Sequence, residues 1–129
     1  MPFVLDTSAV LAILFREAGQ DVVRSALREG ALLSTVNFAE AITRLVRDGM
    51  AADRAAAAIT ALPIGLRELD AQLATDAGAL FAQTRPFGLS LGDRACLALA
   101  RQEGVPTLTG DRVWLQVAPL VGVEVRLIR

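Results

Sequence analysis

The fold class of this chain is decided by the stretch Phe3-Val4-Leu5-Asp6-Thr7-Ser8-Ala9-Val10, near its start. Its first three residues form a short apolar run without a polar face, which is typical of a strand buried on both sides in a parallel sheet. An acid follows at once, and then an apolar run that predicts a helix from Ser8. Open α/β sheets bind their ligands at the carboxyl ends of their strands, so Asp6 is the first candidate site residue.

The rest of the chain alternates between short apolar runs and longer amphipathic ones. We predict further strands at 31–35, 64–69, 106–109 and 123–128. We predict helices at 8–15, 21–29, 37–49, 53–62, 70–81, 92–103 and 111–117, with Asn37 as the N-cap of the third. Strands that alternate with helices favour a parallel α/β sandwich, and a length of 129 residues suits a single domain, residues 1–129.

The composition is that of an ordinary globular protein, with 53% hydrophobic and 21% charged residues. No apolar run approaches the length of about 18 residues that a membrane span needs, and the N-terminus has neither a basic region nor a cleavage site. We therefore expect a mature cytoplasmic protein without a membrane segment. The single cysteine, Cys96, excludes an internal disulfide and suits a reducing compartment.

Histidine and lysine are both missing, and each absence removes a class of chemistry. Without histidine there is no Ser-His catalysis, no histidine-based RNA transesterification and no zinc site with a His ligand. Without lysine a receiver domain is excluded, and every cation is an arginine, whose planar fork suits phosphate. A phosphatase with an Asp nucleophile would need Asp-x-Asp, but Ser8 occupies the required position. The formal net charge of −1 argues against general binding of polyanions.

Four acids lie at junctions between predicted elements: Asp6, Glu40, Asp93 and Asp111. Right-handed crossovers bring three of them to one edge of a parallel sheet, whereas Asp93 reaches it only if the loop before it returns there. Each acid alone has a simpler explanation as a helix cap, and Asn37–Glu40 and Ser90–Asp93 both resemble capping boxes. Four carboxylates in one cleft repel one another, however, and a hard cation such as Mg²⁺ or Mn²⁺ is their natural counter-ion.

Four blocks of sequence surround these acids: Val4-Leu5-Asp6-Thr7-Ser8, Asn37-Phe38-Ala39-Glu40, Leu89-Ser90-Leu91-Gly92-Asp93 and Leu108-Thr109-Gly110-Asp111-Arg112-Val113-Trp114. In this order and spacing they resemble the four conserved blocks of the PIN domain, and more narrowly the VapC-type toxin ribonucleases of bacterial toxin–antitoxin pairs. The resemblance covers essentially the whole chain. It implies a three-layer α/β/α sandwich with a mainly parallel sheet of five strands in the order 3-2-1-4-5. Gly92 departs from the pattern, because the family usually has a larger residue there.

The resemblance also implies an activity and roles for single residues. The acids of a Mg²⁺ or Mn²⁺ site would be Asp6, Glu40, Asp93 and Asp111. The hydroxyls of Thr7 and Thr109 would orient carboxylates or a metal-bound water. The implied activity is metal-dependent hydrolysis of RNA by the toxin of a type II pair, with a VapB-like antitoxin and a homodimer as partners. The alternative is a catalytically weak or inactive PIN domain that binds RNA or protein.

Several other residues have two interpretations. Arg94 and Arg112 each follow a site acid and could hold flanking phosphates, as could Arg44 on the polar side of the helix that carries Glu40. Arg44 also lies four residues after Glu40, and a surface ion pair between them is the competing interpretation. Trp114 is expected to pack beside the turn that follows the fourth strand, with base stacking as the other possibility.

Overall fold

The computed structural model describes residues 2–129, and its centre is a five-stranded parallel sheet. The strands are β1 (Phe3–Leu5), β2 (Ala31–Ser34), β3 (Ile64–Arg67), β4 (Thr107–Thr109) and β5 (Val125–Leu127). Their order is β3-β2-β1-β4-β5, so the opening strand is the middle one and the predicted order is confirmed. Val4 of β1 is in register with Leu32 on one side and with Thr107 on the other.

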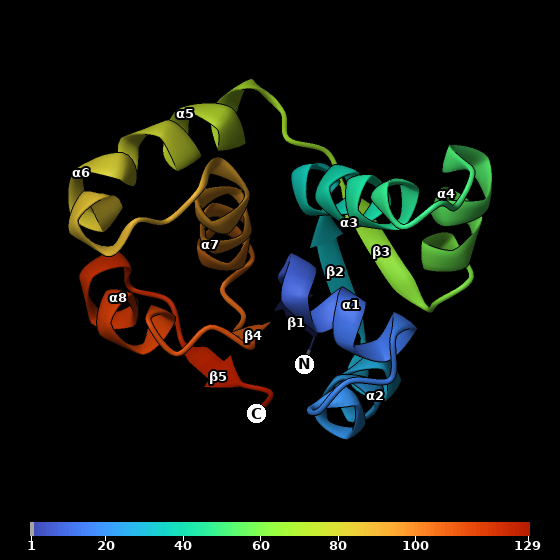
Figure 1. Ribbon diagram of the computed structural model, residues 1–129. Helices are drawn as coiled ribbons and strands as arrows, with labels where there is room; N and C mark the ends of the chain where they lie inside the picture. The colour runs from blue at the N-terminus through green and yellow to red at the C-terminus, as the bar shows by residue number, and fades with distance from the viewer. Residues whose placement is uncertain (1) are drawn as a thin grey trace.

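Helices cover both faces of the sheet, which makes the fold a three-layer α/β/α sandwich (Figure 1). One layer contains α1 (Thr7–Leu14), α2 (Gln20–Glu29), α3 (Thr35–Arg47) and α4 (Ala52–Thr60). The other layer contains α5 (Ala71–Ala79), α6 (Phe81–Thr84), the 3₁₀ turn η1 (Arg85–Phe87), α7 (Leu91–Glu103) and α8 (Trp114–Val121). The first half of the chain therefore covers one face of the sheet, and most of the second half covers the other.

Strand β1 has no polar face because both of its faces are buried. Phe3 and Leu5 belong to the core under α1–α4, which they share with Val23. Val4 points the other way and belongs to the core under α5–α8, together with Leu97. Successive side chains of a strand alternate between its faces, so a strand between two helix layers needs apolar residues at every position.

The start of α3 corrects one prediction. Asn37 is not its N-cap, because α3 begins at Thr35 and the Ser34 hydroxyl accepts a hydrogen bond from Val36 N–H at 3.2 Å. Asn37 instead lies in the first turn of the helix with its side chain buried. The sequence does not reveal this, because Ser34 also fits the end of the second strand, and β2 leads into α3 without a loop residue.

Two other elements have different bounds from those predicted. The helix expected at 111–117 begins at Trp114 and runs to Val121, past Pro119. It ends at Gly122, whose φ of 70° lies in the left-handed region that favours glycine. The helix expected at 70–81 is divided into α5 and α6, and the loop expected at 86–88 is largely the 3₁₀ turn η1.

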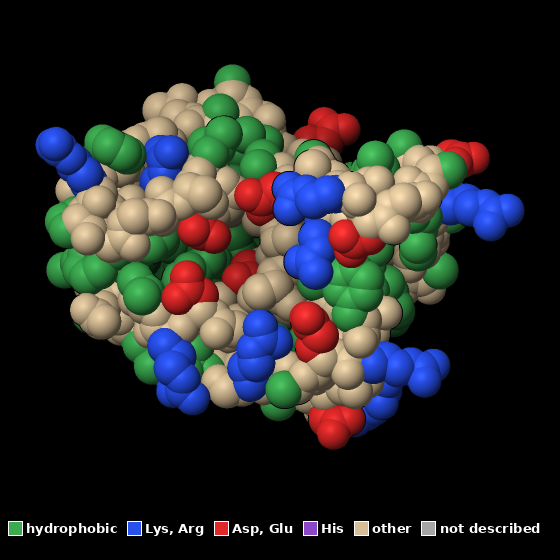
Figure 2. Space-filling view, in the orientation of Figure 1, with side chains coloured by type: hydrophobic (Ala, Val, Ile, Leu, Met, Phe, Trp, Pro, Cys, Tyr) green, Lys and Arg blue, Asp and Glu red, His purple; other side chains and the backbone are tan. Residues whose placement is uncertain are grey.

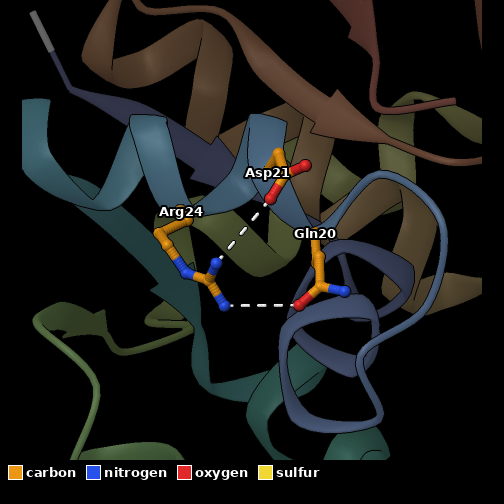
Figure 3. Close-up of polar contacts among 3 residues, drawn as sticks. All are labelled: Gln20, Asp21 and Arg24. Atoms are coloured by element: carbon orange, nitrogen blue, oxygen red, sulfur yellow. Dashed lines mark hydrogen bonds and ion pairs between the residues drawn. The ribbon is translucent and has the colours of Figure 1, made fainter.

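Burial differs strongly between the helices. Helix α7 is buried from Ala95 to Ala100, as its apolar composition predicts. Helix α2 instead has a solvated outer face, where Arg24 donates to Gln20 Oε1 at 3.3 Å and its Nη1 lies 3.7 Å from Asp21 Oδ1 (Figure 3). Within residues 2–129 no helix combines the length and the apolar composition that crossing a membrane requires.

Candidate active site

The candidate site lies at the carboxyl edge of the sheet. The first turns of α1, α3 and α7 meet there with the turn that follows β4. The four predicted acids lie at these junctions: Asp6 is the N-cap of α1, Glu40 is in the second turn of α3, Asp93 is in the first turn of α7, and Asp111 is in the turn after β4. Figure 2 shows acidic side chains gathered around a hollow between the two helix layers, with basic side chains near its rim. The loop before α7 therefore does return to this edge.

Asp6 is the most deeply buried of the four acids, with only 5% of its surface exposed. Its Oδ1 accepts hydrogen bonds from Ser8 Oγ at 2.7 Å and from Ala9 N–H at 2.8 Å, and its Oδ2 accepts one from Thr109 Oγ1 at 2.6 Å. Burial raises the pKa of the Asp6 carboxyl from 3.8 to about 6; the three hydrogen bonds lower it, and the charge of Asp93 raises it. Asp6 is thus both the N-cap of α1 and a neighbour of Asp93.

Asp93 lies in the first turn of α7 and forms the predicted capping box with Ser90. Its Oδ2 accepts Ser90 N–H at 2.9 Å, and Ser90 Oγ accepts Asp93 N–H at 3.2 Å. Burial raises the pKa of the Asp93 carboxyl, and the charges of Glu40 and Asp111 raise it further. The capping interpretation therefore holds for Asp93, and the same residue lies near the other acids of the sheet edge.

Glu40 is held from one side by two donors. Its Oε1 accepts hydrogen bonds from Thr7 Oγ1 at 2.5 Å and from Asn37 Nδ2 at 3.0 Å. Its carboxylate lies against Gly92 of α7, in the space that a Cβ at that position would fill. The predicted role of Thr7 in orienting a carboxylate agrees with this contact, whereas Asn37 and Glu40 do not form a capping box.

Thr109 connects Asp6 to Asp111. Its hydroxyl donates to Asp6 and accepts Asp111 N–H at 3.0 Å. Asp111 is exposed, and its Oδ1 accepts Val113 N–H at 3.0 Å within the turn before α8. Ser8 supports the same turn, because its Oγ accepts Gly110 N–H at 2.9 Å. Two hydroxyl residues thus fix the end of β4 against the start of α1.

The three arginines that could hold phosphate lie in different environments. Arg94 donates to Ala77 O at 3.1 Å and its guanidinium lies over the Phe81 ring, so it is directed towards α5 and α6. Arg112 is exposed and donates to Arg129 O at 3.3 Å. Arg44 pairs with Asp48 at 3.3 Å rather than with Glu40. Arg112 and Arg44 are therefore accessible from solvent, whereas Arg94 is engaged with its own layer.

The donor set suits a hard divalent cation. In the described chain none of the four acids forms an ion pair with an arginine. The charge of Asp93 raises the pKa of Asp6, and the charges of Glu40 and Asp111 raise the pKa of Asp93. Glu40 Oε2, Asp93 Oδ1 and Asp111 Oδ2 accept no hydrogen bond from residues 2–129. No three acidic side chains of that range form a ready-made ligand cluster. Mg²⁺ usually binds through one or two carboxylates and keeps several waters, so the free oxygens fit it.

Two residues of this arrangement were not predicted as site residues. Ser8 forms two hydrogen bonds in this arrangement, with Asp6 and with Gly110 N–H. In the sequence, only its position two residues after Asp6 pointed to such a role. Asn37 connects three segments, but the spacing of Asn37 and Glu40 is equally that of a capping box. Trp114 is fully buried, which confirms that it packs beside the turn and excludes stacking with a base in this conformation.

The protein is thus a parallel α/β/α sandwich with four carboxylates at the carboxyl edge of its sheet. The sequence model of the PIN domain matches residues 3–120, and the chain belongs to the PIN domain family. This agrees with the resemblance seen in the four sequence blocks. A comparison with curated proteins finds no match.

Solved structures share the fold across most of the chain. A chain in the DNA-bound VapBC complex of Salmonella typhimurium is 17% identical with a TM-score of 0.75, and the match covers 100% of this chain and 99% of that one. A chain of VapBC-1 from nontypeable Haemophilus influenzae is 16% identical with a TM-score of 0.73, and the match covers 99% of this chain and 98% of that one. VapC20 of Mycobacterium tuberculosis, a sarcin-ricin loop cleaving toxin, is 19% identical with a TM-score of 0.65. That match covers 81% of this chain and 86% of that one. At these identities the likeness is one of fold.

Proposed function

We propose that this chain is a metal-dependent endoribonuclease and the toxin of a type II toxin–antitoxin pair. The observation that carries the proposal is the crowding of four carboxylates at one sheet edge, without a paired arginine in residues 2–129. Membership of the PIN domain family supports it. The shared fold with VapC20, a sarcin-ricin loop cleaving toxin, supports the same activity.

In the proposed mechanism Asp6 and Asp93 would hold the main divalent ion. Asp111 would complete this site or a weaker second one, and Glu40 would act through a water as a ligand or a base. An Mg²⁺ or Mn²⁺ ion held by these acids would lower the pKa of a water and would supply positive charge to the phosphate. The hydrogen bond from Thr109 keeps Asp6 in place.

The reaction is a hydrolysis. A water oxygen attacks the phosphorus, the bond to the 3′ oxygen breaks, and that oxygen takes up a proton. The products are a 5′-phosphate end and a 3′-hydroxyl end, and the RNA 2′-hydroxyl takes no part. Arg112 and Arg44 are the exposed cations for flanking phosphates, while Arg94 would first have to release the Ala77 carbonyl.

The test compares Asp6→Asn with Asp70→Asn on total RNA, in Mg²⁺ or in EDTA, with the cleaved ends mapped. Both aspartates are N-caps that accept a backbone N–H at 2.8 Å, from Ala9 and Leu73 respectively, so Asp70→Asn is the matched control. We expect wild type and Asp70→Asn to cleave RNA only with Mg²⁺ and to leave 5′-phosphate ends. Cleavage that persists in EDTA, or in Asp6→Asn, would contradict the proposal. RNA that is bound but never cleaved would favour the alternative of a binding module.

We also propose a VapB-like antitoxin and a second copy of this chain as partners. The support is that structures of the same fold were solved as VapBC complexes from Salmonella typhimurium and Haemophilus influenzae. The test is a search of the neighbouring genes for a small VapB-like protein and its co-expression with this chain, followed by light scattering of the purified material. A chain that stays monomeric and captures no neighbour-encoded protein would contradict both partner assignments.

A further inference from the structure

Asn37 connects three segments of the candidate site through one amide group. Its Nδ2 donates to Thr7 Oγ1 at 3.2 Å, to Glu40 Oε1 at 3.0 Å and to Gly92 O at 3.1 Å. The side chain is 1% exposed, so water does not replace these bonds. Its Oδ1 is buried and has no hydrogen-bond partner among residues 2–129. A buried, half-satisfied amide destabilises a fold, and its presence calls for an explanation.

Gly92 provides the space in which Glu40 lies. It is buried in the first turn of α7, and a Cβ built on it would overlap the Glu40 carboxylate. Nothing about its backbone requires glycine, because its φ is not positive. Gly78 of α5 is different, because a Cβ there meets nothing within 4 Å. A side chain at position 92 would therefore force the Glu40 carboxylate to move.

Asn37 and Gly92 together oppose the repulsion between two carboxylates. Glu40 and Asp93 are both acids, and Asp93 follows directly after Gly92, against which the Glu40 carboxylate lies. Without a cation these carboxylates favour moving apart. The Asn37 amide holds the Glu40 carboxylate and the Gly92 carbonyl at the same time, and so keeps the first turns of α3 and α7 together.

We propose that Asn37 and Gly92 are positioning residues that hold the Glu40 carboxylate against the first turn of α7, beside Asp93, and thereby set the affinity of the site for a divalent cation. This rests on the proposed function, in which these acids bind Mg²⁺ or Mn²⁺. Neither residue touches the reacting atoms. Asn37 acts through hydrogen bonds to Glu40, and Gly92 acts by leaving room for it.

The first experiment is a calorimetric titration of the full chain with MnCl₂. We expect Asn37→Ala and Gly92→Ala each to weaken Mn²⁺ binding by about 10-fold or more, as loss of an outer-shell partner usually does. Gly78→Ala is the matched control, because it makes the same change in a helix where the new Cβ meets nothing. Its Mn²⁺ affinity should equal that of the wild type. Gly92→Ala leaves the Asn37 side chain unchanged, so this arm remains informative if Asn37→Ala does not fold.

The second experiment is a cycle of melting temperatures in EDTA, which needs no bound metal. We expect Gly92→Ala to lower the melting temperature of the wild type, because the new methyl group displaces Glu40. In the Glu40→Ala background the overlap is gone, and the same change should raise the melting temperature, because alanine is the better helix former. A purely local effect of position 92 would have the same sign in both backgrounds.

The outcomes separate this inference from the proposed function. If the wild type binds Mn²⁺, Asp6→Asn abolishes binding, and Asn37→Ala and Gly92→Ala bind as the wild type does, the positioning role is overturned and the proposed function stands. If the wild type does not bind Mn²⁺, the proposed function is overturned together with the role in cation affinity. If Gly92→Ala changes the melting temperature equally in both backgrounds, the steric part of the inference is overturned.

Discussion

Thr109 Oγ1 lies 2.6 Å from Asp6 Oδ2, and this hydrogen bond joins two buried residues that are 103 positions apart in the sequence. The same hydroxyl accepts Asp111 N–H, so one side chain connects the central strand with the turn after β4. Thr109 has no exposed surface, and water cannot take over either bond. The relative positions of Asp6 and Asp111 therefore depend on this hydroxyl.

Replacing Thr109 with valine keeps the shape of the side chain and removes the hydroxyl. The pKa of Asp6 should rise further, because the hydrogen bond from Thr109 lowers it. The free energy of unfolding should fall by about 1–3 kcal/mol, because Asp6 and the Asp111 N–H both lose a buried partner. NMR titration of the Asp6 carboxyl and urea unfolding measure the two effects. Thr75→Val is the control, since Thr75 bonds only Ala71 O on an exposed face, and an unchanged Asp6 pKa would contradict the prediction.

Asp6→Asn should stabilise the metal-free protein at neutral pH. The folded-state pKa of about 6 lies above the ordinary 3.8, so between these values the folded protein keeps a proton that the unfolded chain has lost. Stability therefore decreases as the pH rises from about 4 to about 6 and stays low above that. A pKa shift of this size corresponds to roughly 3 kcal/mol in the free energy of unfolding. Asparagine carries no charge to desolvate. The free energy of unfolding of the variant should therefore exceed that of the wild type at about pH 7.5 and approach it at about pH 4.

Urea unfolding at several pH values in EDTA measures this difference. Asp70→Asn is again the control, because it changes an N-cap on the exposed surface of α5. A gain in stability that is equal in both variants, or that does not depend on pH, would contradict the account of Asp6.

Mg²⁺ and Mn²⁺ should raise the melting temperature, because a ligand that binds only the folded state stabilises it. When the metal ion is present at 100 times its dissociation constant, the free energy of unfolding rises by about 2.7 kcal/mol. Asp93→Asn should lose most of this gain, and EDTA should reverse it in the wild type. The control is Asp53→Asn, because Asp53 is likewise an acid in the first turn of a helix, α4, but is exposed and away from the site. Equal stabilisation of both variants by Mn²⁺ would place the ion elsewhere.

Trp114 should act as a packing residue and a reporter of folding. Its side chain is fully buried in the core of the α5–α8 layer, so Trp114→Ala should lower the free energy of unfolding by about 3–5 kcal/mol. Leu115→Ala, at the next position but 47% exposed, should change it far less. Urea unfolding followed by circular dichroism measures both. Trp114 fluorescence in the wild type should not change when RNA is added, and quenching by RNA would revive the stacking interpretation.

The sequence by itself determined the class of fold and provided four candidate acids for the sheet edge. The apolar run from Phe3 to Leu5 can only be satisfied by burial on both faces, and the alternation of strands and helices then requires parallel crossovers. The position of Asp6 follows directly, because a residue at the end of the central strand lies at the carboxyl edge of the sheet. These features are local patterns whose physical meaning does not depend on distant parts of the chain.

Only the tertiary structure decided how the acids are held. Asn37 reads as a helix cap in the sequence, yet its amide bonds Gly92 O, 55 residues away. Arg44 pairs with Asp48 rather than with Glu40, and Arg94 points to α5 instead of towards the acids. Local patterns offer each polar group several partners of similar energy, so the choice among them is made by which helices pack together. Gly92 shows this best, because its importance comes from the Glu40 carboxylate of another helix.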